Sequence, residues 1–192
     1  FVQKGLEVIK YFPVKPVIKG LSYTPSFDER DPIIKGDNWR YYGTGTSVCL
    51  MGAIGYEIEV DKMGSLAGWE SQLLRSALHI DVTIGDVNVT ASRENLRMTD
   101  KTIAAIRKRL AEVKAEMIAQ TELTFKDCKN LIEAKTLYYD TIMGGSGYSQ
   151  ILRDAGVELD WAGEKIKDNK ILLNTDGLPH SVMIYSKRSY RK

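Results

Sequence analysis

Cysteine and histidine are scarce in this sequence, which has two residues of each. The cysteines, Cys49 and Cys128, do not make the disulfide framework of a small secreted domain. Together with His79 and His180 they fit no zinc-ligand spacing, and no Ser-His-Asp or Cys-His arrangement indicates a nucleophilic enzyme. We therefore expect no metal site in the chain, and a reducing cytoplasm as its compartment.

The sequence also lacks a long apolar run and a large excess of charge of either sign. No stretch approaches the roughly 20 apolar residues needed to span a bilayer. The formal net charge of +2 is too small by itself to indicate a nucleic-acid-binding protein. Apolar residues make up 43% of the chain, which is typical of a folded domain. Residues 1–4 contain no initiator methionine and no signal-peptide layout, so we expect a fragment of a longer protein.

Prolines separate the N-terminal end of the chain from the rest. Apolar positions at helical spacing predict a short helix over residues 2–12. Sustained helix is then prevented by Pro13, Pro16, Pro25 and Pro32. We therefore expect residues 1–37 to form a lead-in helix and a proline-rich linker.

Residues 38–143 carry the patterns of a folded domain. Strands are predicted over residues 39–43 and 47–60, and Gly52 and Gly55 indicate a bend or bulge in the second. A short helix is predicted over residues 70–78. Two further strands, residues 79–84 and 87–91, are expected to form a hairpin around a Gly85-Asp86 turn.

Two helices are predicted after this hairpin. Thr99 has the chemistry of an N-cap, and residues 102–118 carry one apolar stripe. That stripe consists of Ile103, Ile106, Leu110, Val113 and Met117. A second helix is predicted over residues 125–142. The pattern as a whole predicts an α+β fold, with a mixed or antiparallel sheet and two long helices on one face.

The glycine-rich stretch 144–147 breaks these patterns and marks the expected domain boundary. Residues 144–192 are expected to begin a further small α+β segment. It should contain a short helix over residues 149–155 and strands over residues 171–173 and 181–186. Neither this stretch nor Gly43–Thr46 has the pattern of a phosphate-binding loop, and both are interpreted as turns.

The triplet Ser92-Arg93-Glu94 is the strongest candidate site, because it lies between the predicted hairpin and a basic helix. A guanidinium keeps its charge and forks its donors, which suits a phosphate. An arginine on a rigid loop can also stabilise charge that develops during phosphoryl transfer. Similar triplets are common on solvated surfaces and at helix caps, so chemistry alone leaves both interpretations open.

The neighbourhood of the triplet resembles the middle domain of the rapid-lysis rIIA-like proteins of tailed phages. The resemblance rests on a Gly-Asp hairpin over residues 84–89, on the motif over residues 91–96 (Ala-Ser-Arg-Glu-Asn-Leu), and on the Thr-initiated basic helix over residues 102–110. The glycine-rich run over residues 50–58 is also similar, with Glu57 where the family has proline. The resemblance covers roughly residues 1–120.

A more distant resemblance is to the middle domain of the heat-shock-ninety chaperones, which have Ser-Arg-Glu-x-Leu before a basic helix. Both groups belong to the GHKL ATPases, together with gyrase B and the mismatch-repair MutL proteins. The resemblance implies a GHKL transducer-like fold for residues 38–143, similar to domain two of ribosomal protein S-five. It also implies that Arg93 reaches the γ-phosphate of ATP. Thr90 and Arg97 depart from the chaperone pattern, which has Asn and Gln there.

The resemblance further implies which groups this chain would contact. Ser92, Arg93 and Arg97 would contact ATP, and Arg93 would be the catalytic group. ATP and magnesium would be bound by an N-terminal ATPase domain of the full-length protein, which is the expected partner. GHKL nucleotide-binding signatures are absent from these residues, so the fragment alone is expected to bind no cofactor and to have no activity. Whether the full-length protein is an active ATPase stays open.

A homodimer, a host protein and a membrane surface are further expected partners, in a protein that acts in lysis inhibition. The expected location is the host bacterial cytoplasm, including the periphery of the inner membrane. The alternative is a phage accessory module that binds nucleic acid or a host protein without ATP coupling. It would use the basic residues of the helix over residues 102–117 and the basic tail over residues 187–192.

Overall fold

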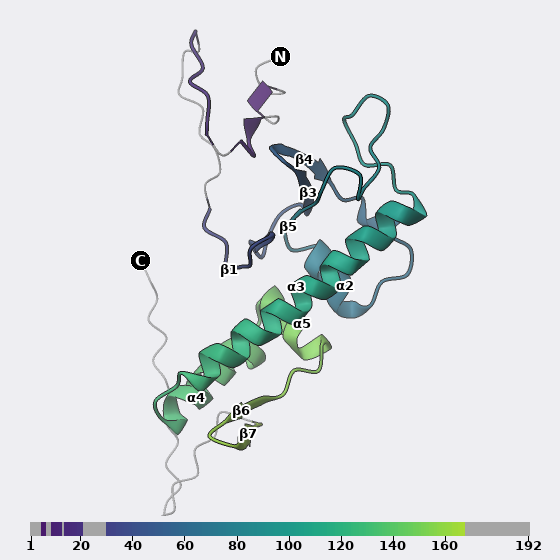
Figure 1. The fold of residues 1–192 in the computed structure, drawn as a ribbon. Helices are drawn as coiled ribbons and strands as arrows, with labels where there is room; N and C mark the ends of the chain where they lie inside the picture. The colour runs from purple at the N-terminus through teal and green to yellow at the C-terminus, as the bar shows by residue number, and fades with distance from the viewer. Residues whose placement is uncertain (1–4, 7–8, 13, 21–29, 168–192) are drawn as a thin grey trace, which may run out of the picture. The chain divides into compact units, whose positions relative to one another are not determined.

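The structure is a computed structural model that describes residues 5–6, 9–12, 14–20 and 30–167 (Figure 1). The chain packs as two compact units, Phe1–Met117 (unit 1) and Ile118–Lys192 (unit 2). The division falls inside a long helix, whereas the predicted boundary lies at residues 144–147. A glycine-rich break is a strong local signal, but compact units are defined by which side chains pack together.

Unit 1 contains a five-stranded mixed sheet in the order β1-β2-β5-β3-β4. The strands are β1 (Ile34–Lys35), β2 (Trp39–Tyr41), β3 (Val48–Met51), β4 (Ile54–Glu57) and β5 (Leu78–Asp81). Strands β3 and β5 pair in parallel, and the other neighbours pair antiparallel. A parallel pair needs a crossover, and here the connection contains a 3-10 turn, η1 (Val60–Lys62), and helix α2 (Gly68–Leu74). The predicted α+β class with a mixed sheet is confirmed.

The register divides the sheet into a core face and a polar face. Trp39, Cys49, Tyr56 and Ile80 lie in one row across β2, β3, β4 and β5, and all four are buried. Because side chains alternate along a strand, the next row, which contains His79, lies on the opposite face. His79 is paired there with Arg40 on β2 and with Val48 on β3.

The predicted long strand over residues 47–60 is wrong, because the structure forms two strands there, β3 and β4. Gly52 has a φ of +62° and forms the two-residue turn of a hairpin with Ala53. Glycine accepts such a φ without strain, which makes it a hairpin residue as readily as a bulge residue. Gly55 has a different role, since a Cβ there would meet the ring of Tyr11.

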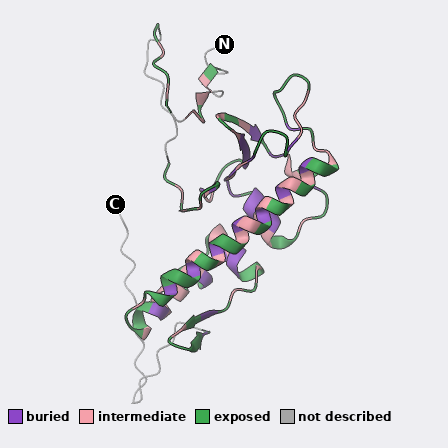
Figure 2. Ribbon diagram, in the orientation of Figure 1, coloured by how far each residue is buried: buried purple, intermediate pink, exposed green. Residues whose placement is uncertain are grey.

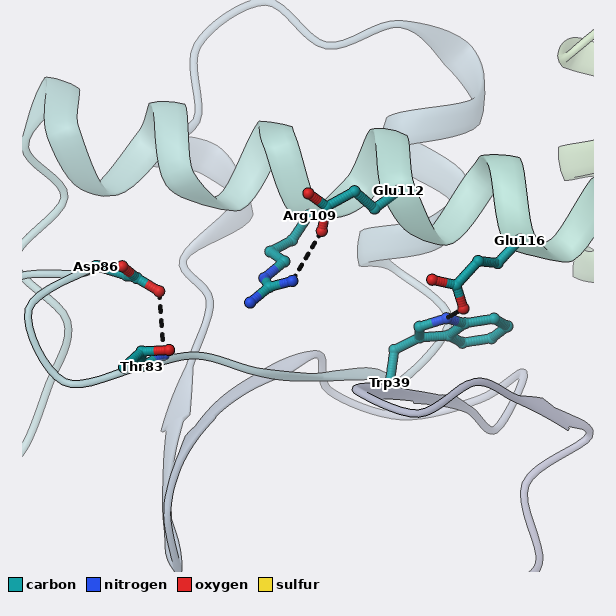
Figure 3. Close-up of polar contacts among 6 residues, drawn as sticks. All are labelled: Trp39, Thr83, Asp86, Arg109, Glu112 and Glu116. Carbon is teal, nitrogen blue, oxygen red and sulfur yellow. Dashed lines mark hydrogen bonds and ion pairs between the residues drawn. The ribbon is translucent and has the colours of Figure 1, made fainter.

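The predicted hairpin over residues 79–91 is also wrong. Strand β5 already pairs with β2 on one edge and with β3 on the other, so no edge is left for residues 87–91. A turn does form at Gly85-Asp86, where Oδ2 of Asp86 accepts a hydrogen bond from the Thr83 amide at 3.1 Å (Figure 3). Val89 instead forms an isolated antiparallel bridge with Leu96.

Helix α3 (Asp100–Lys126) begins as predicted. Oγ1 of Thr99 accepts a hydrogen bond from the Thr102 amide at 3.3 Å, which confirms the N-cap. The predicted stripe recurs along the helix as buried positions (Figure 2), with Ile103 half-buried and Ile106, Leu110, Val113 and Met117 buried.

The second predicted helix, over residues 125–142, is wrong in its start and its length. Helix α3 continues to Lys126, α4 (Leu131–Tyr138) has eight residues, and a π-helical turn, η2 (Tyr139–Met143), follows it. The side chain of Asn130 accepts a hydrogen bond from the Glu133 amide at 2.9 Å, so a new N-cap interrupts the helical periodicity. The predicted second helix is therefore present as a shorter helical run over residues 131–143, formed by α4 and η2.

Unit 2 has a small core built from α3, η2, α5 (Gly147–Asp154) and β6 (Leu159–Trp161). Its buried members are Phe125, Ile142, Leu152 and Leu159. Helix α5 confirms the helix predicted over residues 149–155. Strand β7 (Glu164–Ile166) forms a hairpin with β6 that was not predicted. The strands predicted over residues 171–173 and 181–186 lie outside the described residues. His180 and residues 2–4 and 7–8 of the predicted N-terminal helix also lie outside them.

A polar contact between Trp39 of β2 and Glu116 of α3 helps to join the sheet to the helix in unit 1 (Figure 3). Nε1 of the indole donates to the carboxylate at 2.6 Å, which satisfies the one polar atom of a buried tryptophan. A Cβ on Gly36 would collide with both partners of this bond. Gly36 is therefore required by close packing of side chains.

Gly36→Ala is expected to lower the free energy of unfolding by about 1–3 kcal/mol, because the rigid indole has to shift. Gly145→Ala is the matched control, since a Cβ there meets no atom within 4 Å, and its effect should stay within about 0.5 kcal/mol. Chemical denaturation of both variants checks the difference. Equal stability of the two would contradict the proposed packing role of Gly36.

Candidate arginine loop

The segment that carries Arg93 is attached to the start of helix α3 through Asn88. The Asn88 amide donates to Oγ1 of Thr102 at 3.0 Å, and Nδ2 of Asn88 donates to Oγ1 of Thr99 at 3.0 Å. The two threonine hydroxyls lie 3.2 Å apart. The N-cap thus serves both the helix and the loop before it. Asn88 was not among the predicted site residues, although an asparagine ahead of two threonines near a helix start can make these hydrogen bonds.

The loop is closed by backbone hydrogen bonds around Arg93. The Thr90 amide donates to the Asn95 carbonyl, and the Arg93 amide donates to the Thr90 carbonyl, each at 2.9 Å. Leu96 directly follows this turn and is 3% exposed. A buried leucine at one end and a hydrogen-bonded asparagine at the other hold the backbone of the loop in place.

Arg93 itself has a left-handed backbone, with a φ of +57°. This conformation costs a residue other than glycine roughly 1–2 kcal/mol, so the surrounding hydrogen bonds must enforce it. The side chain is exposed, and no hydrogen bond or ion pair engages its guanidinium within the part of the chain that the structure describes. The loop therefore presents a charged, forked donor to whatever approaches it.

The other residues that the sequence analysis assigned to the site have different surroundings. Oγ of Ser92 lies 3.1 Å from Oγ1 of Thr90, so the serine hydroxyl belongs to the loop's own hydrogen bonds. Arg97 follows the buried Leu96 and is exposed. No ion pair or side-chain hydrogen bond of Arg97 occurs among the described residues. The structure thus places Ser92, Arg93 and Arg97 on one exposed segment, with two unengaged guanidinium groups.

Three basic residues of α3 make contacts within unit 1. Arg107 donates to the carbonyls of Met63 and Ser65. Arg109 forms an ion pair with Glu112 at 2.8 Å (Figure 3). The ammonium group of Lys114 lies 4.3 Å from the ring centroid of Trp69, a cation–π contact.

These contacts bear on the alternative of a nucleic-acid-binding module. Arg107, Arg109 and Lys114 make structural contacts, whereas Lys108 is exposed. Helix α3 therefore offers fewer unengaged cations than its sequence suggests. The basic tail over residues 187–192 lies outside the described residues, so that part of the alternative stays a prediction.

His79 of β5 is the histidine that lies within the described residues, and its surroundings perturb the imidazole. Its pKa is lowered to about 4, first by burial and then by the positive charges of Lys10, Arg40 and Arg30, while Asp81 acts in the opposite direction. The rings of Tyr11 and Tyr42 also contact it. His79 is therefore neutral at pH 7, in a region of positive potential.

The lowered pKa predicts that acid destabilises the fold through His79. Between pH 6.5 and pH 4 the unfolded chain binds a proton at His79 that the folded chain does not, so stability falls as the pH falls through this window. We expect a loss of about 1–2 kcal/mol, allowing for solvent screening at a half-buried site. Urea titrations at several pH values, on the wild type and His79→Gln, measure this loss as a difference. Identical pH dependence in both proteins would contradict the prediction.

Further observations concern metal ions and membrane-spanning helices. The described residues contain no cluster of His, Cys, Asp or Glu that could hold a metal ion, and none of their helices is long and apolar enough to cross a membrane. Searches with protein-family models, among curated proteins and among solved structures each gave no match.

Proposed function

We propose that this chain contains the transducer domain of an rIIA-like GHKL ATPase, and that Arg93 contacts the γ-phosphate of ATP held by another domain of the full-length protein. One observation carries the proposal. Arg93 is exposed and left-handed, and its guanidinium is not engaged by any described residue. Strained residues held in place by their surroundings occur preferentially at functional sites.

The construction of the loop supports a role in stabilising charge. The Thr90–Asn95 and Thr90–Arg93 hydrogen bonds hold the loop backbone, so the loop needs little reorganisation before it meets a phosphate. A donor positioned in advance stabilises developing negative charge more effectively than a mobile one. Arg97 adds a second positive charge near this position, while the Ser92 hydroxyl contributes to holding the loop.

Helix α3 supplies a route from the loop to the rest of the chain. It begins at Asp100, five residues after Asn95, and its later residue Phe125 is buried in the core of unit 2. Engagement of Arg93 by a phosphate would bias the position of the loop and of the helix attached to it. This is how we infer that nucleotide state is coupled to domain docking and dimerisation.

The residues present fit a phosphate but not a complete nucleotide site. Arg93 and Arg97 offer unengaged guanidinium donors, yet the described residues contain no carboxylate cluster for a metal. We propose, from the resemblance alone, that ATP and magnesium are held by a separate ATPase domain and that this chain contributes the arginine. We propose, by the same resemblance, a role in lysis inhibition in the host bacterial cytoplasm, including the inner-membrane periphery.

Single-turnover ATP hydrolysis by the full-length protein, with and without Arg93→Gln, tests the proposal. The variant should hydrolyse bound ATP more slowly, because the transition state loses a charged donor. An unchanged hydrolysis rate would rule out the arginine-loop role.

A further inference from the structure

A cavity of about 1170 Å³ opens over the polar face of the sheet in unit 1. Its cationic lining comes from segments far apart in sequence, namely Lys10, Lys15, Arg30 and Arg40. Asp81 is the carboxylate of the lining. This volume is large enough for a small organic ligand, and the lining carries more positive than negative side chains.

The cations are positioned by contacts that leave them at the cavity wall. Arg40 pairs with Asp81 across β2 and β5, with 3.3 Å between Nη1 and Oδ1. Arg30 donates to the carbonyl and hydroxyl oxygens of Thr44 at 3.2 and 3.3 Å. Lys15 donates to the carbonyls of Lys10 and Phe12 at 2.6 and 2.9 Å. These contacts order the side chains before any ligand enters, which lowers the entropic cost of binding.

Aromatic rings form another part of the same wall. The ring centroid of His79 lies 4.7 Å from that of Tyr42 and 5.5 Å from that of Tyr11. Tyr11 packs against β4 at Gly55, where any Cβ would collide with its ring. The ammonium group of Lys10 lies 5.4 Å from the Tyr11 ring centroid. Cations and aromatic rings are thus interleaved, the composition of sites that hold a phosphate beside a planar group.

The charges also act on one another. Lys10, Arg30 and Arg40 all disfavour the protonated form of His79, so the potential in this region is positive. Like charges that lie close together repel one another, which costs free energy. A bound anion offsets this repulsion. An anionic ligand is therefore the complement of this cavity.

We propose that this cavity binds a phosphorylated small molecule, with its phosphates contacted by Lys10, Arg30 and Arg40 and a planar ring packed beside Tyr11 and Tyr42. The cavity is built from residues 10–82 and does not include Arg93. This binding site is therefore independent of the arginine loop, and either proposal can fail without the other.

Calorimetric titration of the 192-residue chain at fixed ionic strength tests the proposal, with pyrophosphate, ADP and adenosine as probes. We expect saturable binding of pyrophosphate, tighter binding of ADP, and no binding of adenosine. Equal affinity for pyrophosphate and ADP would overturn the ring contact and support the phosphate contact. Absence of saturable binding by both phosphorylated probes would overturn the proposal.

Variants with one altered charge test whether the named side chains set the affinity for the probes. Lys10→Gln should weaken binding about three- to tenfold, while Asp81→Asn should tighten it because Arg40 then loses its competing carboxylate. Lys108→Gln makes the same charge change as Lys10→Gln, on the exposed side of α3, and should leave affinity within about twofold. Equal weakening by Lys10→Gln and Lys108→Gln would show non-specific attraction and overturn the site.

The imidazole of His79 provides a spectroscopic readout that does not depend on calorimetry. The chain has two histidines, so comparison with His79→Gln assigns its NMR signal directly. A bound phosphate near the ring favours the imidazolium and should raise the pKa of His79 from about 4 by about one unit or more. An unchanged His79 titration in the presence of saturating pyrophosphate would place the anion elsewhere and overturn the proposal.

Discussion

Full-length protein carrying Arg93→Gln is expected to hydrolyse bound ATP about 10²–10³-fold more slowly than the wild type in single-turnover experiments. This is the usual loss when one charge-stabilising donor is removed from a transition state. ATP affinity should change by a few-fold at most, because under the proposed function a separate ATPase domain would make the remaining contacts. A transition-state effect lowers the rate of the chemical step more than it lowers binding.

Two variants separate the guanidinium from the backbone that carries it. Arg93→Gly removes the side chain and relieves the left-handed strain at φ +57°, so its thermal stability should equal or exceed that of the wild type. Arg93→Lys keeps the charge but loses the forked donors, and it should recover only part of the rate. A stable Arg93→Gly protein with normal hydrolysis would show that the arginine has no role in it.

Leu96→Ala is expected to lower the free energy of unfolding by about 2–5 kcal/mol, the usual cost of truncating a buried leucine. Leu96 is 3% exposed, and the loop that carries Arg93 ends at this side chain. The variant should therefore also release the loop, which would be seen as faster amide exchange at Arg93 and Asn95. Denaturant titration and hydrogen exchange measure the two effects.

Leu123→Ala is the matched control for this prediction. Leu123 is 60% exposed and lies within α3, where alanine is an equally good helix former. Its free energy of unfolding should change by no more than about 0.5 kcal/mol. If both variants lost the same stability, Leu96 would not anchor the loop.

Helix α3 shows which parts of the fold can be predicted from sequence. Its start at Thr99 depends on one side chain and the amide three residues later, and its stripe depends on spacing within the helix. Both are local properties that can be recognised in sequence. The end of the helix was missed, because α3 continues past residue 118 to Lys126. The start of the next helix was missed because its N-cap, Asn130, lies inside the apolar pattern over residues 125–142.

Strand pairing was predicted less well, because partners are chosen across the whole chain. Residues 79–91 have the pattern of a hairpin, yet β5 pairs with β2 and β3. The glycine at position 52 was recognised as a break, but its φ decides between a bulge and a turn, and φ is not evident from sequence. The predicted strand pairing was therefore wrong, although the predicted α+β fold class was right.

In the candidate site, too, local features could be predicted from the sequence, whereas features that depend on other segments could not. The positions of Ser92, Arg93 and Arg97 on one exposed loop could be predicted, since they are consecutive or nearly so. The left-handed backbone of Arg93 and the role of Asn88 could not, because both depend on hydrogen bonds to other segments. The cationic cavity was missed for the same reason, because Lys10 and Asp81 share its lining only after the sheet forms.

The boundary between Met117 and Ile118 lies within a continuous helix, and this affects how the two units gain and lose order. Units joined by a loop can unfold independently. Here, unwinding the last turns of α3 would remove Phe125 from the core of unit 2. It would also remove the backbone hydrogen bonds that stabilise the preceding turns of the helix. Helix propagation is cooperative. Order imposed on either unit by a ligand should therefore slow amide exchange in the other, with α3 as the shared cooperative segment.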